Sequence, residues 1–229
     1  MNSIFNSIAD AWSLIISFNS ELFGIIGLTL SVTLLSTIIS SAIGISTGIL
    51  IGSTEFFGKK LILRLVHTFM GLPPVIAGLV VYLLLSRKGP LGELRLLFTP
   101  TAMVIAQVII ILPVITGLTI AAVKLKVKPI KETCKGLGMG KTNTLFMLFH
   151  ECRYPIISAL LAGYGRAVSE VGAVMLVGGN IQHNTRVMTT AIVLETGKGN
   201  YDRALALGII LLIMSFLINW VLQRFQEGT

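Results

Sequence analysis

The sequence predicts an all-α membrane protein that crosses the bilayer five times. Of its 229 residues, 54% are hydrophobic and only 12% are charged, about half the charged share of an average soluble domain. Its mean hydropathy is +0.87. Five stretches are apolar enough to form the helix of about 20 residues that spans a bilayer. No soluble domain fits between them, so residues 1–229 form a single transmembrane domain.

The spans are expected at residues 22–52, 61–86, 100–123, 156–179 and 204–224. Residues 1–21 precede them, with apolar side chains at helical spacing and no Lys or Arg. The missing basic region argues against a secretory signal peptide. The spacing predicts a helix lying at the membrane interface, with a weakly amphipathic terminus as the alternative.

The basic residues predict the orientation of the chain. Segments 53–64 and 124–153 and the C-terminal tail together hold eleven of the 18 Lys and Arg residues, and the opposite side holds six. The richer side is cytoplasmic by the positive-inside rule. We therefore expect the N-terminus outside and the C-terminus in the cytoplasm of a plasma or inner cell membrane. The net charge of +8 then reflects cytoplasmic loops and contact with membrane lipid, and no nucleic acid is expected.

Prolines are expected to interrupt two of the spans. Pro73 and Pro74 lie near the middle of 61–86, and Pro113 lies within 100–123. Proline removes a backbone donor and clashes with the preceding turn, and in lipid the freed carbonyls need partners from protein or water. Broken helices therefore favour a position beside a pathway. A simple kink in a packed helix is the alternative.

The fourth span contains Arg166 and Glu170 among apolar residues. Each charge at membrane depth costs about 2.5–3.5 kcal/mol on insertion scales. Because residues four apart share a helix face, the two side chains are expected to pair, with the Ser169 hydroxyl beside them. The pair is either a clip that fixes helix packing or an element of a pathway in which Arg166 attracts an anion.

The sequence provides no catalytic site and no metal site. Its three histidines lie in different segments, its two cysteines match no ligand spacing, and no serine lies in a G-x-S-x-G frame. The stretch GLGMGKT at 136–142 looks like a phosphate-binding loop, but only three residues separate Gly136 from Gly140, where that loop needs four. We therefore expect no enzyme activity and no cofactor on this chain.

The basic segment 124–154 carries the most specific pattern. Glu132 is followed by Thr133 and, six residues after it, by Gly138. This resembles the EAA loop of ABC-importer permeases, which implies two short helices with a turn at the glycine and docking into a separate ATPase. Glu132 and Thr133 suit a helix start, and the glycines permit a left-handed turn. The residues expected to couple to the ATPase are Glu132, Thr133, Gly136, Gly138, Met139, Gly140, Leu145 and Phe146.

Three further stretches are similar to permeases for molybdate, sulfate and tungstate. RAVSEVGAVMLVGGN, which begins at Arg166, resembles their R-A-x-x-E-x-G-A signature, GLPPVIAGL resembles their Leu-Pro-Pro segment, and NTRVMTT resembles an outer loop. His150-Glu151, where the EAA loop often has Leu-Pro, is most similar to tungstate permeases. The resemblance implies pathway or gate residues Pro73, Pro74, Arg166, Ser169 and Glu170. It implies binding-protein docking by Asn184, Thr185, Arg186, Thr189 and Thr190. The alternative for segment 180–203 is a solvated loop that merely connects two spans.

The resemblance also implies an architecture and partners. It implies the type I ABC-importer permease fold, a second copy of this chain, and two cytoplasmic ABC ATPase subunits that hold Mg-ATP. It further implies an extracellular or periplasmic binding protein for a tetrahedral oxyanion, with tungstate expected before molybdate or sulfate. One alternative is a secondary anion transporter with Glu170 as its proton site, although five spans form no inverted repeat. The other is a membrane assembly subunit without transport, which leaves the prolines unexplained.

Overall fold

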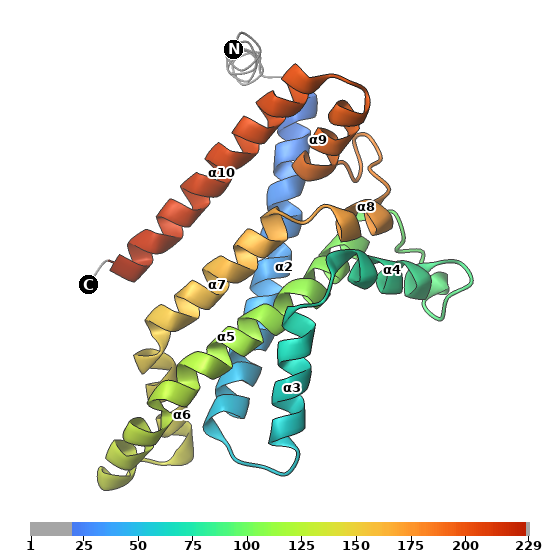
Figure 1. The fold of residues 1–229 in the computed structure, drawn as a ribbon. Coiled ribbons are helices and arrows are strands. Elements are labelled where there is room, and N and C mark those ends of the chain that lie inside the picture. Colours follow the sequence, from blue (N-terminus) through green and yellow to red (C-terminus); the bar gives the residue numbers. More distant parts are fainter. Residues whose placement is uncertain (1–19, 228–229) are drawn as a thin grey trace.

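The computed structural model describes residues 20–227, so the interfacial helix predicted for 1–21 falls almost wholly outside the described residues. Every element within that range is helical (Figure 1). Three helices are long and apolar enough to cross a membrane, and two bent helix pairs raise the number of candidate spans to five at most. The three single helices are α2 (Ser20–Ser53), α5 (Pro100–Gly136) and α10 (Tyr201–Glu227).

The bent pairs and the shorter elements complete the fold. The first pair is α3 (Lys59–Met70) with α4 (Pro74–Leu85), bent by 100°, and the second is α6 (Lys141–Glu151) with α7 (Arg153–Val168), bent by 64°. The remaining elements are η1 (Gly92–Leu94), α8 (Gly172–Gly178) and α9 (Met188–Gly197). The span predicted at 61–86 is therefore bent between α3 and α4. The span predicted at 156–179 is divided between α7, which ends at Val168, and α8, which begins at Gly172.

Helices α2 and α5 form the centre of the molecule and pack along most of their length. Three glycines on α2, Gly44, Gly48 and Gly52, line this contact at intervals of four residues. A Cβ atom on Gly48 would lie 2.7 Å from the Cβ of Thr119 on α5. Small residues at this spacing let two helix backbones approach closely in a membrane, where packing is the main force between helices.

A buried hydrogen-bond chain joins α2, α5 and α7. The Ser36 hydroxyl on α2 donates to Oε1 of Gln107 on α5 at 2.7 Å, and Nε2 of Gln107 donates to the Ala167 carbonyl on α7 at 3.1 Å. Both side chains are buried and make the contacts that a polar group out of water requires. The chain fixes the register of the three helices near the middle of the fold.

The two proline sites behave differently. At Leu72–Pro73 the span breaks as predicted, because Pro73 is extended and Pro74 begins α4, where a missing N–H removes no hydrogen bond. At Pro113 the predicted interruption is wrong, because α5 continues through it to Gly136. The neighbours packed around α5 stabilise its helical path, and the Thr116 hydroxyl bonds the Leu112 carbonyl at 2.7 Å within the same turn.

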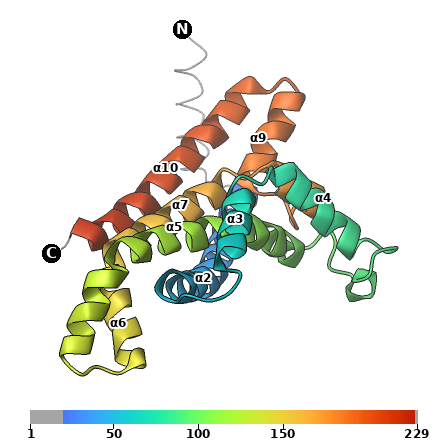
Figure 2. The same ribbon diagram turned by 60° about the horizontal axis from the view of Figure 1, so that its bottom comes forward.

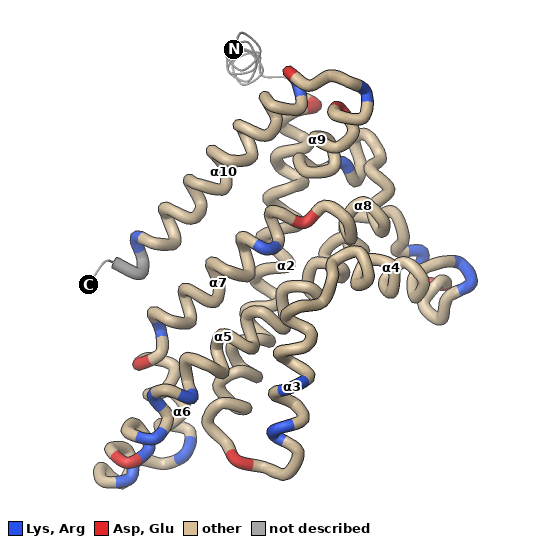
Figure 3. Tube along the Cα trace, viewed as in Figure 1, with Lys and Arg blue, Asp and Glu red and all other residues tan. Residues whose placement is uncertain are grey.

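The charged segments lie at the ends of the fold. Figure 3 shows Lys gathered on the end of α5 that adjoins α6, with further basic residues on α3. Figure 2 shows α6 and this end of α5 projecting from the bundle as a hairpin. The two segments predicted to be cytoplasmic, 53–64 and 124–153, thus lie at one end of the molecule (Figure 1). The 180–187 loop and α9 lie at the opposite end.

Candidate functional site

The glycine-rich turn that joins α5 to α6 is the first candidate site. Gly138 has φ +68° and is the only one of Gly136, Gly138 and Gly140 in the left-handed region. Its N–H bonds the Lys135 carbonyl at 3.1 Å, and the Met139 N–H bonds the Cys134 carbonyl at 2.8 Å. These bonds satisfy carbonyls that the end of α5 would leave free. The predicted left-handed turn is therefore confirmed at Gly138, whereas Gly136 ends the helix and Gly140 is extended.

The predicted start of this element is wrong. Glu132 and Thr133 do not begin a helix, because α5 continues without a break from the membrane region to Gly136. The Thr133 hydroxyl instead donates to the Pro129 carbonyl at 3.0 Å, one turn back. The segment 124–154 is consequently not a loop but a long helix end and a second helix.

The basic hairpin, defined as residues 124–151, is fixed to the bundle on its inner side. Leu148 and Cys152 are fully buried in a cluster with Ile49 of α2 and Val123 of α5. Lys126 Nζ donates to the Glu151 carbonyl at 2.7 Å. Lys131 Nζ donates to the Ser53 carbonyl at the end of α2. These contacts connect the hairpin to both central helices.

The outer side of the hairpin is apolar and basic. Leu137 and Phe146 are each 71% exposed, and Phe149 is 45% exposed. Leu145, which we expected on this surface, is half-buried and packs inward with Leu148. A separate groove lies between the hairpin and the end of α2, and it is lined by Ser53, Thr54, Lys131, Lys135, Gly138, Met139, Lys141, Thr144, Leu145 and Leu148. Exposed large apolar side chains with a charged rim indicate a protein partner.

The second candidate site is the junction, defined as the place where the α3–α4 break meets the α7–α8 break. Span four ends its first helix at Val168, and α8 begins at Gly172. Arg166 Nη2 donates to the carbonyl of Leu72, the residue before Pro73, at 3.3 Å. Ser169 is exposed, and its hydroxyl donates to the Arg166 carbonyl at 3.2 Å.

The predicted Arg166–Glu170 ion pair is wrong. The helix ends between the two residues, so the four-residue spacing no longer puts them on one face. Glu170 is 5% exposed, and its Oε1 accepts the Ala173 N–H at 2.8 Å, at the first turn of α8. The Thr189 hydroxyl also donates to the Glu170 carbonyl at 3.0 Å. Glu170 therefore shapes the break and is not the partner of Arg166.

The outer loop around 180–187 is the third candidate site. Three of its five predicted docking residues, Thr185, Thr189 and Thr190, are buried and cannot contact a docked protein from there. Thr185 donates to the Gly178 carbonyl and accepts the Ile181 N–H, and Thr190 bonds the backbone of Val187. These threonines are buried because their short hydroxyl side chains satisfy backbone groups in a tight turn. Asn184 is exposed and Arg186 is half-buried.

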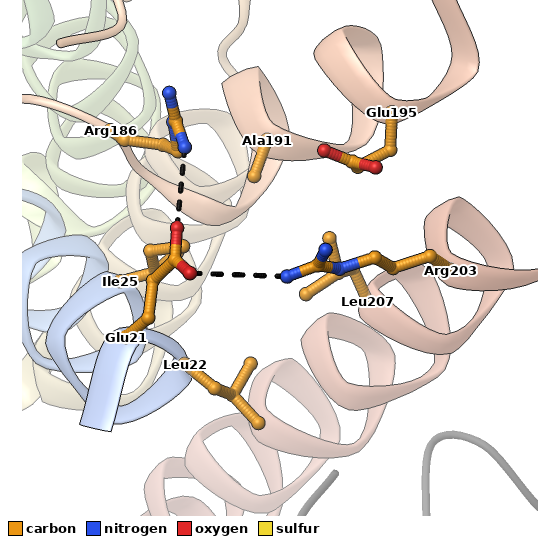
Figure 4. A pocket seen from close by; sticks show the side chains of 8 residues that line it. All are labelled: Glu21, Leu22, Ile25, Arg186, Ala191, Glu195, Arg203 and Leu207. Atoms are coloured by element: carbon orange, nitrogen blue, oxygen red, sulfur yellow. Dashed lines mark hydrogen bonds and ion pairs between the residues drawn. The ribbon is translucent and has the colours of Figure 1, made fainter. Parts of the chain in front are cut away.

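Sequence reasoning missed a cluster of charges at this end. Figure 4 shows Glu21 of α2 between Arg186 and Arg203, with Oε1 at 3.4 Å from Arg186 Nη1 and Oε2 at 4.0 Å from Arg203 Nη2. Gln182 Nε2 donates to the same Glu21 carboxylate at 2.9 Å. One carboxylate thus joins the start of α2, the outer loop and the start of α10. Glu21 and Gln182 are 161 residues apart, and no local pattern signals such a contact.

Glu195 stabilises the turn between α9 and α10. It accepts hydrogen bonds from Asn200 Nδ2 and Lys198 Nζ, each at 2.9 Å. These donors lower the pKa of the Glu195 carboxyl below its ordinary value of 4.5, because both favour the ionised form. The side chain is buried, so the outer turn depends on its charge.

Residues 44–228 match the family described as the binding-protein-dependent transport system inner membrane component. The chain belongs to this family. The permease is 40% identical over 227 residues to the tungstate uptake system permease protein TupB of Peptoclostridium acidaminophilum, covering 99% of this chain and 100% of that protein. It is 40% identical over 213 residues to a probable anion ABC transporter permease protein of Haloferax volcanii, covering 91% and 92%.

A solved structure supports the fold. A chain of the crystal structure of an amino acid ABC transporter with histidines superposes on the permease with a TM-score of 0.63. The match covers 94% of this chain and 97% of that chain at 14% identity, so it bears on the fold alone. The permease is a multi-pass membrane protein with the fold of an ABC transporter permease.

Proposed function

We propose that the permease forms the membrane channel of an ATP-driven importer for tungstate, a tetrahedral oxyanion. The supporting observation is its 40% identity along the whole chain to a tungstate uptake system permease. Two copies of the chain would form the channel, two cytoplasmic ATPase subunits would bind Mg-ATP, and an extracellular or periplasmic binding protein would deliver the oxyanion. The permease itself hydrolyses nothing.

The basic hairpin is the proposed contact with the ATPase. Leu137 and Phe146 provide exposed apolar side chains, and the exposed Lys135 and Lys141 flank the turn between them, so that apolar and charged groups are combined as in many protein interfaces. The anchors at Leu148 and Lys131 connect this surface to α2 and α5. Closure of the ATPase pair on ATP would pull the two hairpins together and favour the outward-facing state. ATP can shift the permease to the outward-facing state only if the closed ATPase pair binds that state more tightly than the inward-facing state.

The proposed orientation follows the charge distribution. The basic hairpin would lie in the cytoplasm, with the N-terminus outside and the C-terminus inside. The 180–187 loop would then face the binding protein, with Asn184 and Arg186 as contact candidates. A secondary anion transporter with Glu170 as its proton site stays the alternative; this carboxylate is buried and accepts one backbone N–H at Oε1.

Uptake by the complete complex tests the proposal. The permease, its ATPase and its binding protein are reconstituted in liposomes that enclose ATP, and tungstate entry is measured against added molybdate or sulfate. We expect ATP-dependent tungstate uptake that a tenfold excess of sulfate leaves nearly unchanged. Equal competition by sulfate would contradict tungstate as the substrate, and the absence of any oxyanion uptake would contradict the transport function.

A further inference from the structure

The junction contains a cation that has no carboxylate partner. Within residues 20–227 the guanidinium of Arg166 forms no ion pair, since the four ion pairs found there involve other residues. Its Nη2 contacts the Leu72 carbonyl, and its Nε is buried without a hydrogen-bond partner. A charge in the membrane region normally pairs with another group or lines a pathway. The contact with one carbonyl leaves most of the five donors of this side chain unused.

The ordinary explanation for such a residue does not apply here. An arginine inside a membrane protein often neutralises a nearby carboxylate and fixes helix packing. Glu170 is the acidic residue nearest to Arg166 in the sequence, and its carboxylate instead binds the backbone at the start of α8. The arginine therefore keeps its positive charge uncompensated by the carboxylates that the structure describes.

The surroundings of Arg166 suit an oxyanion. The α3–α4 break brings the Leu72 carbonyl to the guanidinium, and the α7–α8 break exposes Ser169 one turn further along the chain. The Ser169 hydroxyl can rotate from the Arg166 carbonyl and donate to an anion. A guanidinium binds tetrahedral oxyanions through two parallel N–H donors. A single half-buried arginine is also weak enough to release the ion, as conduction requires.

We infer that Arg166, with Ser169, forms a transient binding site for the transported oxyanion at the junction of the two helix breaks. The identity of the ion rests on the proposed function, whereas the site itself does not. Without the ion, the guanidinium donates its one hydrogen bond to the Leu72 carbonyl. An entering oxyanion replaces that weak contact and leaves toward the cytoplasm when the junction rearranges.

Thiol labelling at the junction tests this site. Both native cysteines, Cys134 and Cys152, are buried, and a variant with serine at both positions provides a background without them. Ser169→Cys is then added, and the permease–ATPase complex is treated with an anionic and a cationic methanethiosulfonate reagent of similar size. The ratio of the two labelling rates measures the local potential. We expect Arg166→Gln to lower the anionic-to-cationic ratio about tenfold, given one unit charge within roughly 8 Å in a partly screened site.

Matched variants separate a local charge effect from a structural one. Arg166→Lys should keep the ratio within about threefold of the starting protein, because it retains the charge. Arg224→Gln removes the same charge on α10 and should leave the ratio unchanged. Thr196→Cys on the exposed end of α9, at the end of the molecule opposite the hairpin, reports any change remote from the junction, and Arg166→Gln should not alter its labelling.

Protection by the ion completes the test. Tungstate should slow labelling of the Ser169→Cys variant at least threefold when Arg166 is present and should have no effect after Arg166→Gln. The inference is overturned if Arg166→Gln leaves the ratio unchanged, if neither reagent reaches the Ser169→Cys variant, or if tungstate, molybdate and sulfate all fail to protect. Protection by sulfate alone supports the site and contradicts tungstate as the substrate, so the two proposals fail separately.

Discussion

Replacing Gly138 should weaken the contact with the ATPase through the backbone alone. Gly138 has φ +68°, and a Cβ atom built there meets no other atom within 4 Å. Any loss on substitution within the permease therefore arises from the left-handed conformation and not from a steric clash. Gly136 and Gly140 also have open surroundings but lack a positive φ. They are matched controls in the same turn.

The backbone conformation sets the size of the effect. An L-residue in the left-handed region costs roughly 1–2 kcal/mol, and 1.4 kcal/mol corresponds to about a tenfold change in an equilibrium constant. If the ATPase binds only the native turn, Gly138→Ala raises the apparent Kd by up to about 5- to 30-fold. Gly138→Asn should weaken binding less, because Asn adopts this conformation several-fold more readily than other residues. Gly138→Val should weaken it most, because a β-branched residue is an outlier there.

The assay is the affinity of the detergent-solubilised permease for its ATPase, measured by titration for each variant. We expect the order Gly, Asn, Ala, Val from tightest to weakest, with Gly136→Ala equal to the wild type. An order in which Ala binds more tightly than Asn would show that the ATPase rejects side-chain size, which refutes the backbone argument. An equal loss for Gly136→Ala would refute the assignment of the turn to Gly138.

Three further predictions test the packing, the hairpin and the outer turn. Gly48→Ala should destabilise the protein by about 1–3 kcal/mol through overpacking against Thr119. Gly27→Ala on the same helix is the control, because its added Cβ meets no atom and should not destabilise the protein. Equal thermal unfolding of the two variants would contradict the α2–α5 contact. Leu148→Ala should lower the free energy of unfolding by about 2–5 kcal/mol because Leu148 is fully buried. Phe146→Ala should keep the stability and weaken ATPase binding, because Phe146 is exposed. A stable Leu148→Ala variant would count against Leu148 as an anchor of the hairpin. Glu195→Gln should lack the stability that the wild type gains from the depressed pKa of Glu195. The difference in free energy of unfolding between the two proteins should be constant above about pH 4.5 and shrink as the pH falls through the lower folded-state pKa. A difference that grows in acid would contradict this account.

Local rules predicted the features that depend on a single residue type. The Leu72–Pro73 break follows from the lost proline donor, and the turn at Gly138 follows from the one residue without a Cβ. The continuation of α5 past Lys124 was missed because the lysines indicated a loop. Its apolar residues Val127, Ile130 and Cys134 in fact recur at helical spacing and bury one face. That periodicity was available in the sequence.

Other features depend on residues far apart and had no local signal. The α7–α8 break contains no proline, and it depends on the Glu170 carboxylate at Ala173 and on Thr189 from another segment. The pairing of Arg166 with Glu170 assumed a continuous helix, so it failed with the break. The buried threonines of the outer loop were expected on the surface because the NTRVMTT stretch resembles a docking loop. Their backbone partners appear only in the folded chain.

Motor-dependent transport tests the central claim most directly. Tungstate entry is measured in sealed liposomes that contain the permease alone, with an imposed ion or proton gradient. It is compared with liposomes that also contain the ATPase, internal ATP and the loaded binding protein. The account predicts uptake only in the second set and its loss when ATP is replaced by a non-hydrolysable analogue. Sustained uptake by the permease alone would contradict it.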